Sequence, residues 1–278
     1  MSAVSGRGTR GEASGFAGSL VVVTGAGSGI GRATAFDFAR RGAHVVCADI
    51  DGPAAEATAR EANGEARIVD VGDRTAMARF ADELVSARGA PEVLVNNAGV
   101  GLSGSFLDTT PDDWEWILGV NLNGVIHGCQ VFGPAMLARG HGHVVNVSSG
   151  LAYAPRATEP GYVTSKAAVL ALTRCLRADW GPRGVGVSAV CPGVVATAIV
   201  ETARFRGDRA SAESVARVRR LFARGHRPEL VAKAIVDAVR RDRPVVPVGG
   251  EAWAGWLLRG IVPSRAADRL ARASFAGV

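Results

Sequence analysis

A tyrosine and a lysine, Tyr162 and Lys166, stand four residues apart in the stretch GYVTSK. Residues at i and i+4 of a helix project side by side. A free phenol has a pKa of about 10, but a neighbouring ammonium stabilises its anion and lowers that pKa. Such a tyrosine can take a proton from an alcohol, or give one to a carbonyl oxygen, while a hydride is transferred. The pair alone is a weak sign, because tyrosine beside lysine on a helix usually reflects packing and a long charged side chain that reaches solvent.

A glycine-rich stretch, TGAGSGIG at 24–31, follows the apolar run LVVVT and precedes a helix-like segment. Glycines at such a turn let the backbone approach a pyrophosphate, which meets the unpaired N–H groups at the positive end of the helix. The spacing is TGxxxGxG, because Ile30 stands where the GxGxxG pattern counted from Gly25 requires glycine. Together with an acid downstream, this turn predicts a dinucleotide site. Its predicted members are Gly25, Ser28, Gly29, Ile30 and Gly31.

The acid downstream is Asp49, which ends the run HVVCAD twenty residues beyond Gly29. A carboxylate there can accept hydrogen bonds from both ribose hydroxyls, whereas a 2′-phosphate would meet like charge. Neither Ser28 nor Ile50 offers a compensating base. The sequence therefore predicts NAD rather than NADP as cofactor, with the alternative that Asp49 is only a helix N-cap or turn residue.

The elements that must position these residues alternate, from Leu20 onward, between short Val-rich runs and longer Ala- and Arg-rich stretches. The short runs are continuously apolar, as in strands that are covered on both faces of a parallel sheet. This repetition predicts an α/β fold: a Rossmann-type doubly wound parallel sheet of about seven strands, with helices on both faces. We expect a long helix over 111–139, which Pro134 should end early or kink, a helix over about 161–180, and an edge strand at 244–248.

The remaining segments define the domain organisation. Residues 1–15 are small, polar and Gly-rich, which predicts a disordered tail. A single domain then covers 16–248, and its segment 198–225 is interpreted either as a lid or as a surface helix pair. A C-terminal helical extension, 249–278, interleaves apolar residues with arginines. It could cover a substrate cleft, pack at a subunit interface or lie on a membrane surface, with packing on its own domain as the default.

The composition of the chain limits the kinds of partner and compartment that we expect. The formal net charge is +6, but the only lysines are Lys166 and Lys233 and the arginines are scattered among acidic residues, so we expect no nucleic-acid partner. The four cysteines form no CxxC pair, which indicates a reducing compartment. The HGH at 141–143 lacks acidic or thiol companions, and no metal site is expected. Without an apolar run of about 18 residues or a signal-peptide core, the sequence predicts a cytoplasmic protein with no integral membrane segment.

Six motifs occur in a fixed order along the chain, and together they resemble the single-domain branch of the short-chain dehydrogenase/reductase superfamily. The resemblance covers about residues 16–200 and implies an NAD-type oxidoreductase acting on CH–OH groups, assembled as a homodimer or homotetramer. The motifs are TGxxxGxG at 24–31, NNAG at 96–99, Asn121, NVSS at 146–149, YVTSK at 162–166 and PGVVAT at 192–197.

The resemblance also implies roles for individual residues. Ser149, thirteen residues before Tyr162, would hold the substrate oxygen, and Tyr162 would transfer the proton. Lys166 would bind the ribose hydroxyls and assist the tyrosine, and Asn121 would hold a water that links Lys166 to solvent. The further cofactor contacts implied are Asp70 and Val71 beside the adenine, Asn97 and Gly99 along the adenosine half, and Val195 and Thr197 at the nicotinamide carboxamide.

The expected substrate pocket is almost wholly apolar, with no arginine clearly placed to pair with a carboxylate or phosphate. This predicts a lipophilic secondary alcohol or its ketone as the small-molecule substrate. The segment 99–133 and the stretch VVPVGGEAW also resemble dehydrogenase domains that some actinobacterial proteins carry fused to an α/β-hydrolase, which points to lipids. A protein that binds NAD(H) as a sensor or scaffold, without turnover, stays as the alternative. The expected pocket residues are Gly101, Leu102, Phe106, Leu151, Ala152, Tyr153, Pro155, Val194, Ile199 and Trp256.

Overall fold

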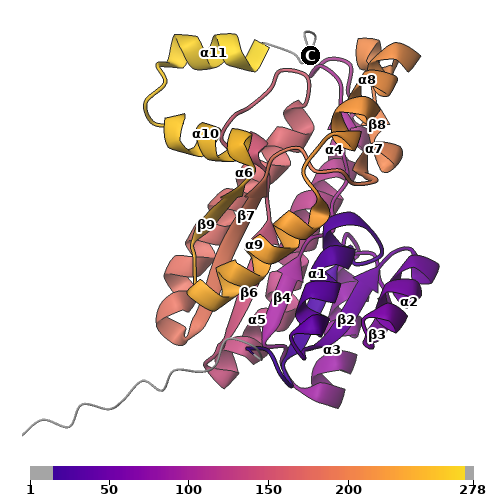
Figure 1. Cartoon of the computed structure of the whole chain (residues 1–278), viewed down its shortest axis with the longest axis vertical. Helices are drawn as coiled ribbons and strands as arrows, with labels where there is room; N and C mark the ends of the chain where they lie inside the picture. The colour runs from indigo at the N-terminus through magenta and orange to yellow at the C-terminus, as the bar shows by residue number, and fades with distance from the viewer. Residues whose placement is uncertain (1–14, 273–278) are drawn as a thin grey trace, which may run out of the picture.

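Seven strands form one sheet in which every neighbouring pair is parallel, in the order β3-β2-β1-β4-β6-β7-β9 (Figure 1). The computed structural model describes residues 15–272, so the predicted tail lies, apart from Gly15, outside the described residues. The predicted fold class is confirmed. The strands are β1 Leu20–Thr24, β2 His44–Asp49, β3 Glu65–Ile68, β4 Val93–Asn96, β6 Gly142–Val147, β7 Val185–Pro192 and β9 Val245–Val248.

Both faces of the sheet are buried, as the continuous apolar runs require. In β1, Val21 and Val23 belong to one hydrophobic cluster and Val22 to a second one on the opposite face. The first cluster packs against α1 and α9, and the second against α3, α5 and α6. The main helices are α1 Gly29–Arg40, α2 Gly52–Glu61, α3 Arg74–Arg88, α4 Pro111–Leu118, α5 Gly124–Arg139, α6 Pro160–Trp180 and α9 Pro228–Arg241.

The predicted helix over 111–139 is wrong in one respect, because a π-helical segment, η1 Gly119–Asn123, separates α4 from α5. A π-bulge shifts the hydrogen-bond register by one residue and turns a side chain to a new direction, which hydrophobic periodicity does not reveal. The residue at its centre is the fully buried Asn121. The predicted edge strand at 244–248 is confirmed, since β9 lies at the end of the sheet.

Pro134 does not end its helix early, because α5 continues through it to Arg139. A proline inside a helix costs about 3 kcal/mol. Phe132 and Met136 flank it and are fully buried, and each large apolar side chain contributes about 1.5–3 kcal/mol on burial. Packing of the flanking residues is therefore large enough to keep this segment helical.

The segment 198–225, interpreted as a lid, folds into short elements tied to the loop after β4. Its strand β8 pairs with β5 through Leu102↔Arg204 and Ser103↔Phe205. Within the described residues nothing tests whether this segment moves, and the lid stays a prediction. The elements concerned are β5 Leu102–Ser103, α7 Ile199–Thr202, β8 Arg204–Phe205, η4 Gly207–Ala210 and α8 Ala212–Ala223.

Charged groups fasten β8 to the start of α4. Asp113 is buried, completes a capping box with Thr110, and accepts hydrogen bonds from Arg206 at 2.7 Å and Arg204 at 3.2 Å. Arg204 also lies over the ring of Trp116 at 4.0 Å. Because Arg206 and Arg204 stabilise its anion, the pKa of Asp113 lies well below its usual range.

Two helices follow β9 and lie beyond the carboxyl end of the sheet, α10 Gly250–Leu258 and α11 Ser264–Arg272 (Figure 1). Helix α10 packs on the loop after β6, where the Tyr153 hydroxyl donates to Ala252 O at 2.8 Å and the Tyr153 ring meets Trp256 edge to face. Within residues 15–272, no helix is both long and apolar enough to cross a bilayer.

We expect Asp113→Asn to lower the free energy of unfolding by about 2 kcal/mol at neutral pH, since it removes a buried charge with two arginine partners. The folded pKa of Asp113 is depressed, so its contribution is present above pH ~4 and is lost as the pH falls below that value. Denaturant titrations should therefore show the gap between wild type and variant narrowing in acid. The control is Asp112→Asn, an exposed neighbour without an ion pair in the structure; an equal loss there would contradict the assignment.

Candidate active site

The predicted site residues gather at the carboxyl edge of the sheet, because parallel strands all end on the same side. Thr24 ends β1, Asn97 follows β4, and Ser149 follows β6. The Thr24 hydroxyl accepts hydrogen bonds from Asn97 N at 3.0 Å and Ala98 N at 3.1 Å, which joins the ends of two neighbouring strands. The loops that follow β1 and β4 are thus held together by hydrogen bonds.

The glycine-rich turn is built to bring backbone close to a ligand. Gly25 has φ +64°, a left-handed conformation that favours glycine, and Asn97 Nδ2 donates to Gly25 O at 3.2 Å. A Cβ at Gly31 would overlap the Gly25 carbonyl, so only glycine lets α1 begin here. Ser28 is the N-cap but makes no side-chain capping bond, and the first turn of α1 has no acidic residue. Its N–H groups therefore suit the pyrophosphate of a dinucleotide.

Asp49 lies at the end of β2 beside this turn. Its Oδ2 accepts from Gly27 N at 2.7 Å and its Oδ1 from Asp51 N at 3.0 Å. Asp51, not Asp49, caps α2, because it accepts from Ala54 N at 3.0 Å. Arg32 was not singled out from the sequence, but its guanidinium bonds to Gly27 O and to Thr58 Oγ1. The position of Arg32 in the first turn of α1 did not predict these two contacts.

The predicted adenine residues, Asp70 and Val71, follow β3, which ends at Ile68. Val71 is buried, its carbonyl accepts from His127 Nδ1 at 2.9 Å if that nitrogen carries the proton, and its side chain contacts Gly124 closely. Asp70 accepts from Gly72 N at 2.8 Å. The strand lies at the sheet edge, where three of its residues are partly buried and Ile68 is exposed.

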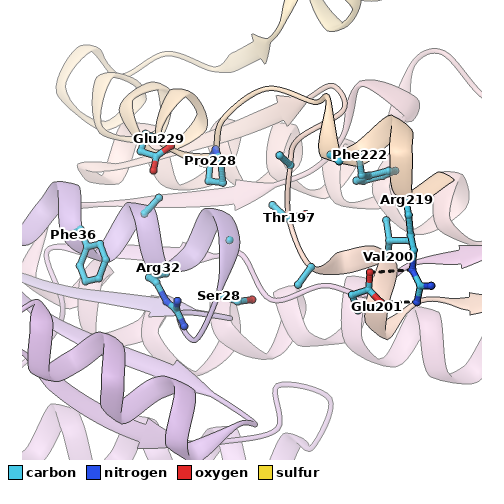
Figure 2. Close-up of a pocket in the computed structure, with 15 residues that line it drawn as sticks. Ser28, Arg32, Phe36, Thr197, Val200, Glu201, Arg219, Phe222, Pro228 and Glu229 are labelled. Carbon is cyan, nitrogen blue, oxygen red and sulfur yellow. Dashed lines mark hydrogen bonds and ion pairs between the residues drawn. The ribbon is translucent and has the colours of Figure 1, made fainter. Parts of the chain in front are cut away.

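The loop after β7 reaches back to the glycine-rich turn. A Cβ at Gly29 would lie 2.9 Å from Thr197 Cγ2, and Val195 is buried and forms a bridge with His226. Beside them a cavity of about 540 Å³ opens between the start of α1, the loop at 196–201 and α8 (Figure 2). Figure 2 places Arg32 on one side and the Glu201–Arg219 ion pair on the other. The cavity includes Ser28, Gly29 and Thr197 but does not reach Tyr162.

The predicted catalytic residues are brought together on α6 and the strand end beside it. Lys166 is buried, donates to Val147 O at 2.9 Å, and has its Nζ 5.9 Å from the centroid of the Tyr162 ring. Ser148 donates to Lys166 O at 2.8 Å, so its hydroxyl supports α6. Ser149 instead forms a hydrogen bond with Tyr162 and accepts from Leu151 N at 3.2 Å. This division of roles supports the choice of Ser149.

Asn121 faces the same group from η1. Its Oδ1 accepts from Val100 N at 2.8 Å, and its Nδ2 donates to Val100 O at 3.0 Å and Ser165 Oγ at 3.2 Å. A Cβ at Gly99 would lie 3.2 Å from Asn121 Oδ1 and 3.3 Å from Lys166 Nζ. A side chain at Gly99 would therefore be tightly packed between the Asn121 amide and the Lys166 ammonium.

Burial dominates the electrostatics of this group. It raises the pKa of Tyr162 to about 12, although the hydrogen bond with Ser149 acts the other way. It lowers the pKa of Lys166 from its ordinary 10.5 to about 8. The sequence predicted that the Lys166 ammonium lowers the pKa of Tyr162, but in the structure this pKa is raised. Both groups lie in a poorly solvated site that disfavours charge on either of them.

Two charged residues beside the site were missed in the sequence. Glu159 precedes α6, and its negative charge raises the pKa of Tyr162 further; burial raises the pKa of Glu159 itself. The Glu159 anion is stabilised by Arg156 and, to a smaller extent, by Arg209 in η4, which also donates to Ser103 Oγ at 3.2 Å. The cleft is therefore less uniformly apolar than expected. The two residues are 50 positions apart, so only the packing of the 198–225 segment brings them together.

A further missed residue is Glu251 at the start of α10. It accepts from Val194 N at 2.9 Å and pairs with His226 Nε2 at 3.0 Å. A Cβ at Gly193 would overlap the Glu251 carboxylate, which accounts for the glycine of the PGVVAT motif. Helix α10 thus holds the loop that carries Val195 and Thr197.

Several known proteins are similar to this chain over most of its length. The sequence model of the family described as short chain dehydrogenase matches residues 19–206. The probable oxidoreductase EphD of Mycobacterium tuberculosis is 43% identical over 259 residues, which cover 89% of this chain and 44% of that protein. The chain therefore spans less than half the length of this relative. The C alpha-dehydrogenase of a Sphingobium species is 37% identical over 234 residues, 79% of this chain and 77% of that protein.

Solved structures agree with the sequence matches. The crystal structure of a short chain dehydrogenase/reductase from Burkholderia phymatum in complex with NAD has a TM-score of 0.81 and 33% identity, covering 88% of this chain and 94% of that chain. The resemblance drawn from the six motifs is confirmed. The resemblance to longer actinobacterial proteins is also confirmed. EphD is a mycobacterial oxidoreductase whose full length is more than twice the matched length.

We expect Lys166→Met to raise the free energy of unfolding at pH 7. A pKa shift from 10.5 to about 8 corresponds to roughly 3 kcal/mol, and loss of the bond to Val147 O costs about 1, leaving a gain of about 2 kcal/mol. Between pH 8 and 10.5 the unfolded chain binds more protons at Lys166, so this group makes wild-type stability rise with pH and the gap closes. Chemical denaturation from pH 7 to about 10 measures this.

Lys233→Met is the matched control, because Lys233 is the one other lysine and is exposed. It should change the free energy of unfolding by less than about 0.5 kcal/mol at every pH. A loss of stability in Lys166→Met at pH 7 would contradict a destabilising buried ammonium.

Proposed function

Because the chain belongs to the short-chain dehydrogenase/reductase family and is therefore an oxidoreductase, we propose that it interconverts a lipophilic secondary alcohol and its ketone with NAD as cofactor. The observation that carries the proposal is the placement of Ser149, Tyr162 and Lys166 beside the dinucleotide turn at one sheet edge. A proton-transfer group and a hydride carrier must meet at one carbon, and this edge brings their binding groups together.

In the oxidative direction, Tyr162 takes the proton of the substrate hydroxyl, and Ser149 donates a hydrogen bond to the same oxygen. The nicotinamide, when bound, accepts the hydride from the carbinol carbon. Because its pKa is about 12, Tyr162 holds its proton at neutral pH and must pass it on before it can act as a base. Lys166, with a pKa of about 8, is partly neutral in the physiological range and suits that task. In the reverse direction, the protonated tyrosine is ready to protonate the carbonyl oxygen.

The cofactor preference rests on Asp49. Its carboxylate is held beside the glycine-rich turn by Gly27 N and Asp51 N, where the adenosine ribose hydroxyls would lie. A 2′-phosphate would meet this negative charge, while Arg32 is engaged with Gly27 O and Thr58. The NAD in the Burkholderia phymatum structure supports the same preference.

The substrate class rests on the walls of the cleft. Leu102 is buried, and Leu151, Val194 and Ile199 are partly buried around the same edge. Apolar walls bind an alcohol through its hydrocarbon part and leave orientation to a few polar groups. Arg209 and Glu159 lie at one side of the cleft, so a single polar group on the substrate can be accommodated there.

Tyr162→Phe should lower kcat by at least about 10²-fold while leaving NADH binding unchanged, because only the proton-transfer group is lost. The measurement is NAD-dependent oxidation of secondary alcohols graded from short-chain to steroidal, with NADH binding followed by fluorescence. The chain has one other tyrosine, and Tyr153→Phe makes the same chemical change at a hydroxyl that bonds Ala252 O. This control should keep most of its turnover.

Three results would count against the proposal. Persistent turnover in Tyr162→Phe would show that Tyr162 is not the base. A preference for short, charged alcohols would show that the proposed substrate class is wrong. NADH binding without turnover across the whole panel would favour the sensor or scaffold.

Asp49→Asn should lower the ratio of kcat/KM with NAD to kcat/KM with NADP by at least about tenfold, since the repulsion of a 2′-phosphate is removed. Asp51→Asn is matched in chemistry and lies two residues away, and asparagine caps helices as well as aspartate does. That control should keep the ratio. An unchanged ratio in Asp49→Asn would show that another group selects the cofactor.

A further inference from the structure

Exposed apolar side chains are concentrated at one end of the molecule. Ten large hydrophobic residues are exposed in residues 15–272, and five of them lie within 253–270. Exposed apolar residues that are scattered singly over a surface need no explanation. Half of the exposed set within one short segment indicates a contact surface. The five are Trp253 at 40%, Leu257 at 63%, Leu258 at 48%, Ile261 at 75% and Leu270 at 65% exposure.

This segment is joined by hydrogen bonds to the loop after β5 at the carboxyl edge of the sheet. Ala157 N donates to Ala271 O of α11 at 2.9 Å, and Gly104 N donates to Thr158 O at 2.8 Å. The loop at 157–158 therefore joins α11 to the loop after β5, which carries the exposed Phe106 and Leu107. Figure 1 places α10 and α11 at the end of the molecule where α6, β7 and β9 reach the carboxyl edge. Seven of the ten exposed apolar residues thus lie in the 253–270 segment or in the loop after β5, which these hydrogen bonds connect.

The charges of the segment are predominantly positive. From Trp253 to Arg272 there are four arginines and a single acid, Asp268. Arg265, Arg269 and Arg272 recur at helical spacing on one side of α11, and Ala266 and Leu270 lie on the other. Arg259 lies over the Trp256 ring at 3.3 Å, so its charge stays beside the apolar surface. Apolar and tryptophan side chains flanked by arginines are the composition of helices that lie in a membrane interface.

From this arrangement we propose that α10, α11 and the intervening turn dock on an anionic phospholipid surface, with the opening of the active site facing the lipid. In a two-fold contact between copies, the same arginines of both would meet on one patch, whereas anionic headgroups neutralise them. A lipophilic substrate would then pass from the bilayer to Tyr162 without crossing water. Only this last point rests on the proposed function, and docking itself does not.

The test is co-sedimentation of the full chain with vesicles, of phosphatidylcholine alone or with about one third phosphatidylglycerol. We expect binding to the anionic vesicles, weaker binding at high salt, and little binding to the neutral ones. Leu257→Asp and Ile261→Asp should each lower the bound fraction by at least about fivefold, and Arg265→Glu/Arg269→Glu should do the same. Leu230→Asp, at an exposed leucine of α9, should bind like wild type.

Absence of binding to either vesicle, or equal binding by Ile261→Asp and wild type, would overturn the proposal. So would a change of oligomeric state in Ile261→Asp without vesicle binding in wild type, measured by light scattering, since the surface would then join copies of the chain. All variants lie at exposed positions, and unfolding midpoints verify that they fold. Turnover of a short, water-soluble secondary alcohol, measured without vesicles, tests the chemistry separately, so failure of docking and failure of the proposed function are distinguishable.

Discussion

The structure of the site depends on one ammonium group held away from water. The Lys166 ammonium donates a hydrogen bond to Val147 O, and burial lowers its pKa to about 8. Such a group is unfavourable for stability and needs the fold around it to hold it in place. Ser148 fixes the α6 backbone at this residue, and the π-helical segment turns Asn121 toward it across Gly99. Neighbouring strands and helices are thus arranged around a buried charge that lowers stability and that, in the proposed function, takes part in proton transfer.

Local patterns predicted the fold because each buried strand of a parallel sheet requires a short, continuously apolar run in the sequence. Both faces of β1 are buried, so Leu20–Val23 are all apolar, and the same holds for Val93–Val95 of β4. The glycine-rich turn was predictable for a similar reason, since Gly31 must leave room for the Gly25 carbonyl. Constraints between residues that are close in the chain, or on adjacent strand ends, leave a recognisable spacing.

The rest depended on contacts between distant residues. Glu159 and Arg209 come together only through the segment after β7, and Glu251 meets Val194 across 57 positions. The bulge at 119–123 changes hydrogen-bond register without changing the apolar pattern. The pKa of Tyr162 also escaped prediction, because desolvation depends on everything packed around the phenol, whereas the sequence displays only the neighbouring lysine.

The hydrogen bond from Val194 to Glu251 has a consequence for where the catalytic unit ends. The family match stops at residue 206, yet the loop carrying Val195 and Thr197 is held by a carboxylate 45 positions further on, at the start of α10. That helix also closes over the loop after Ser149 through Tyr153. Helix α10 is therefore part of the structure that shapes this loop, and the smallest excisable module that keeps Val195 and Thr197 in place must reach α10.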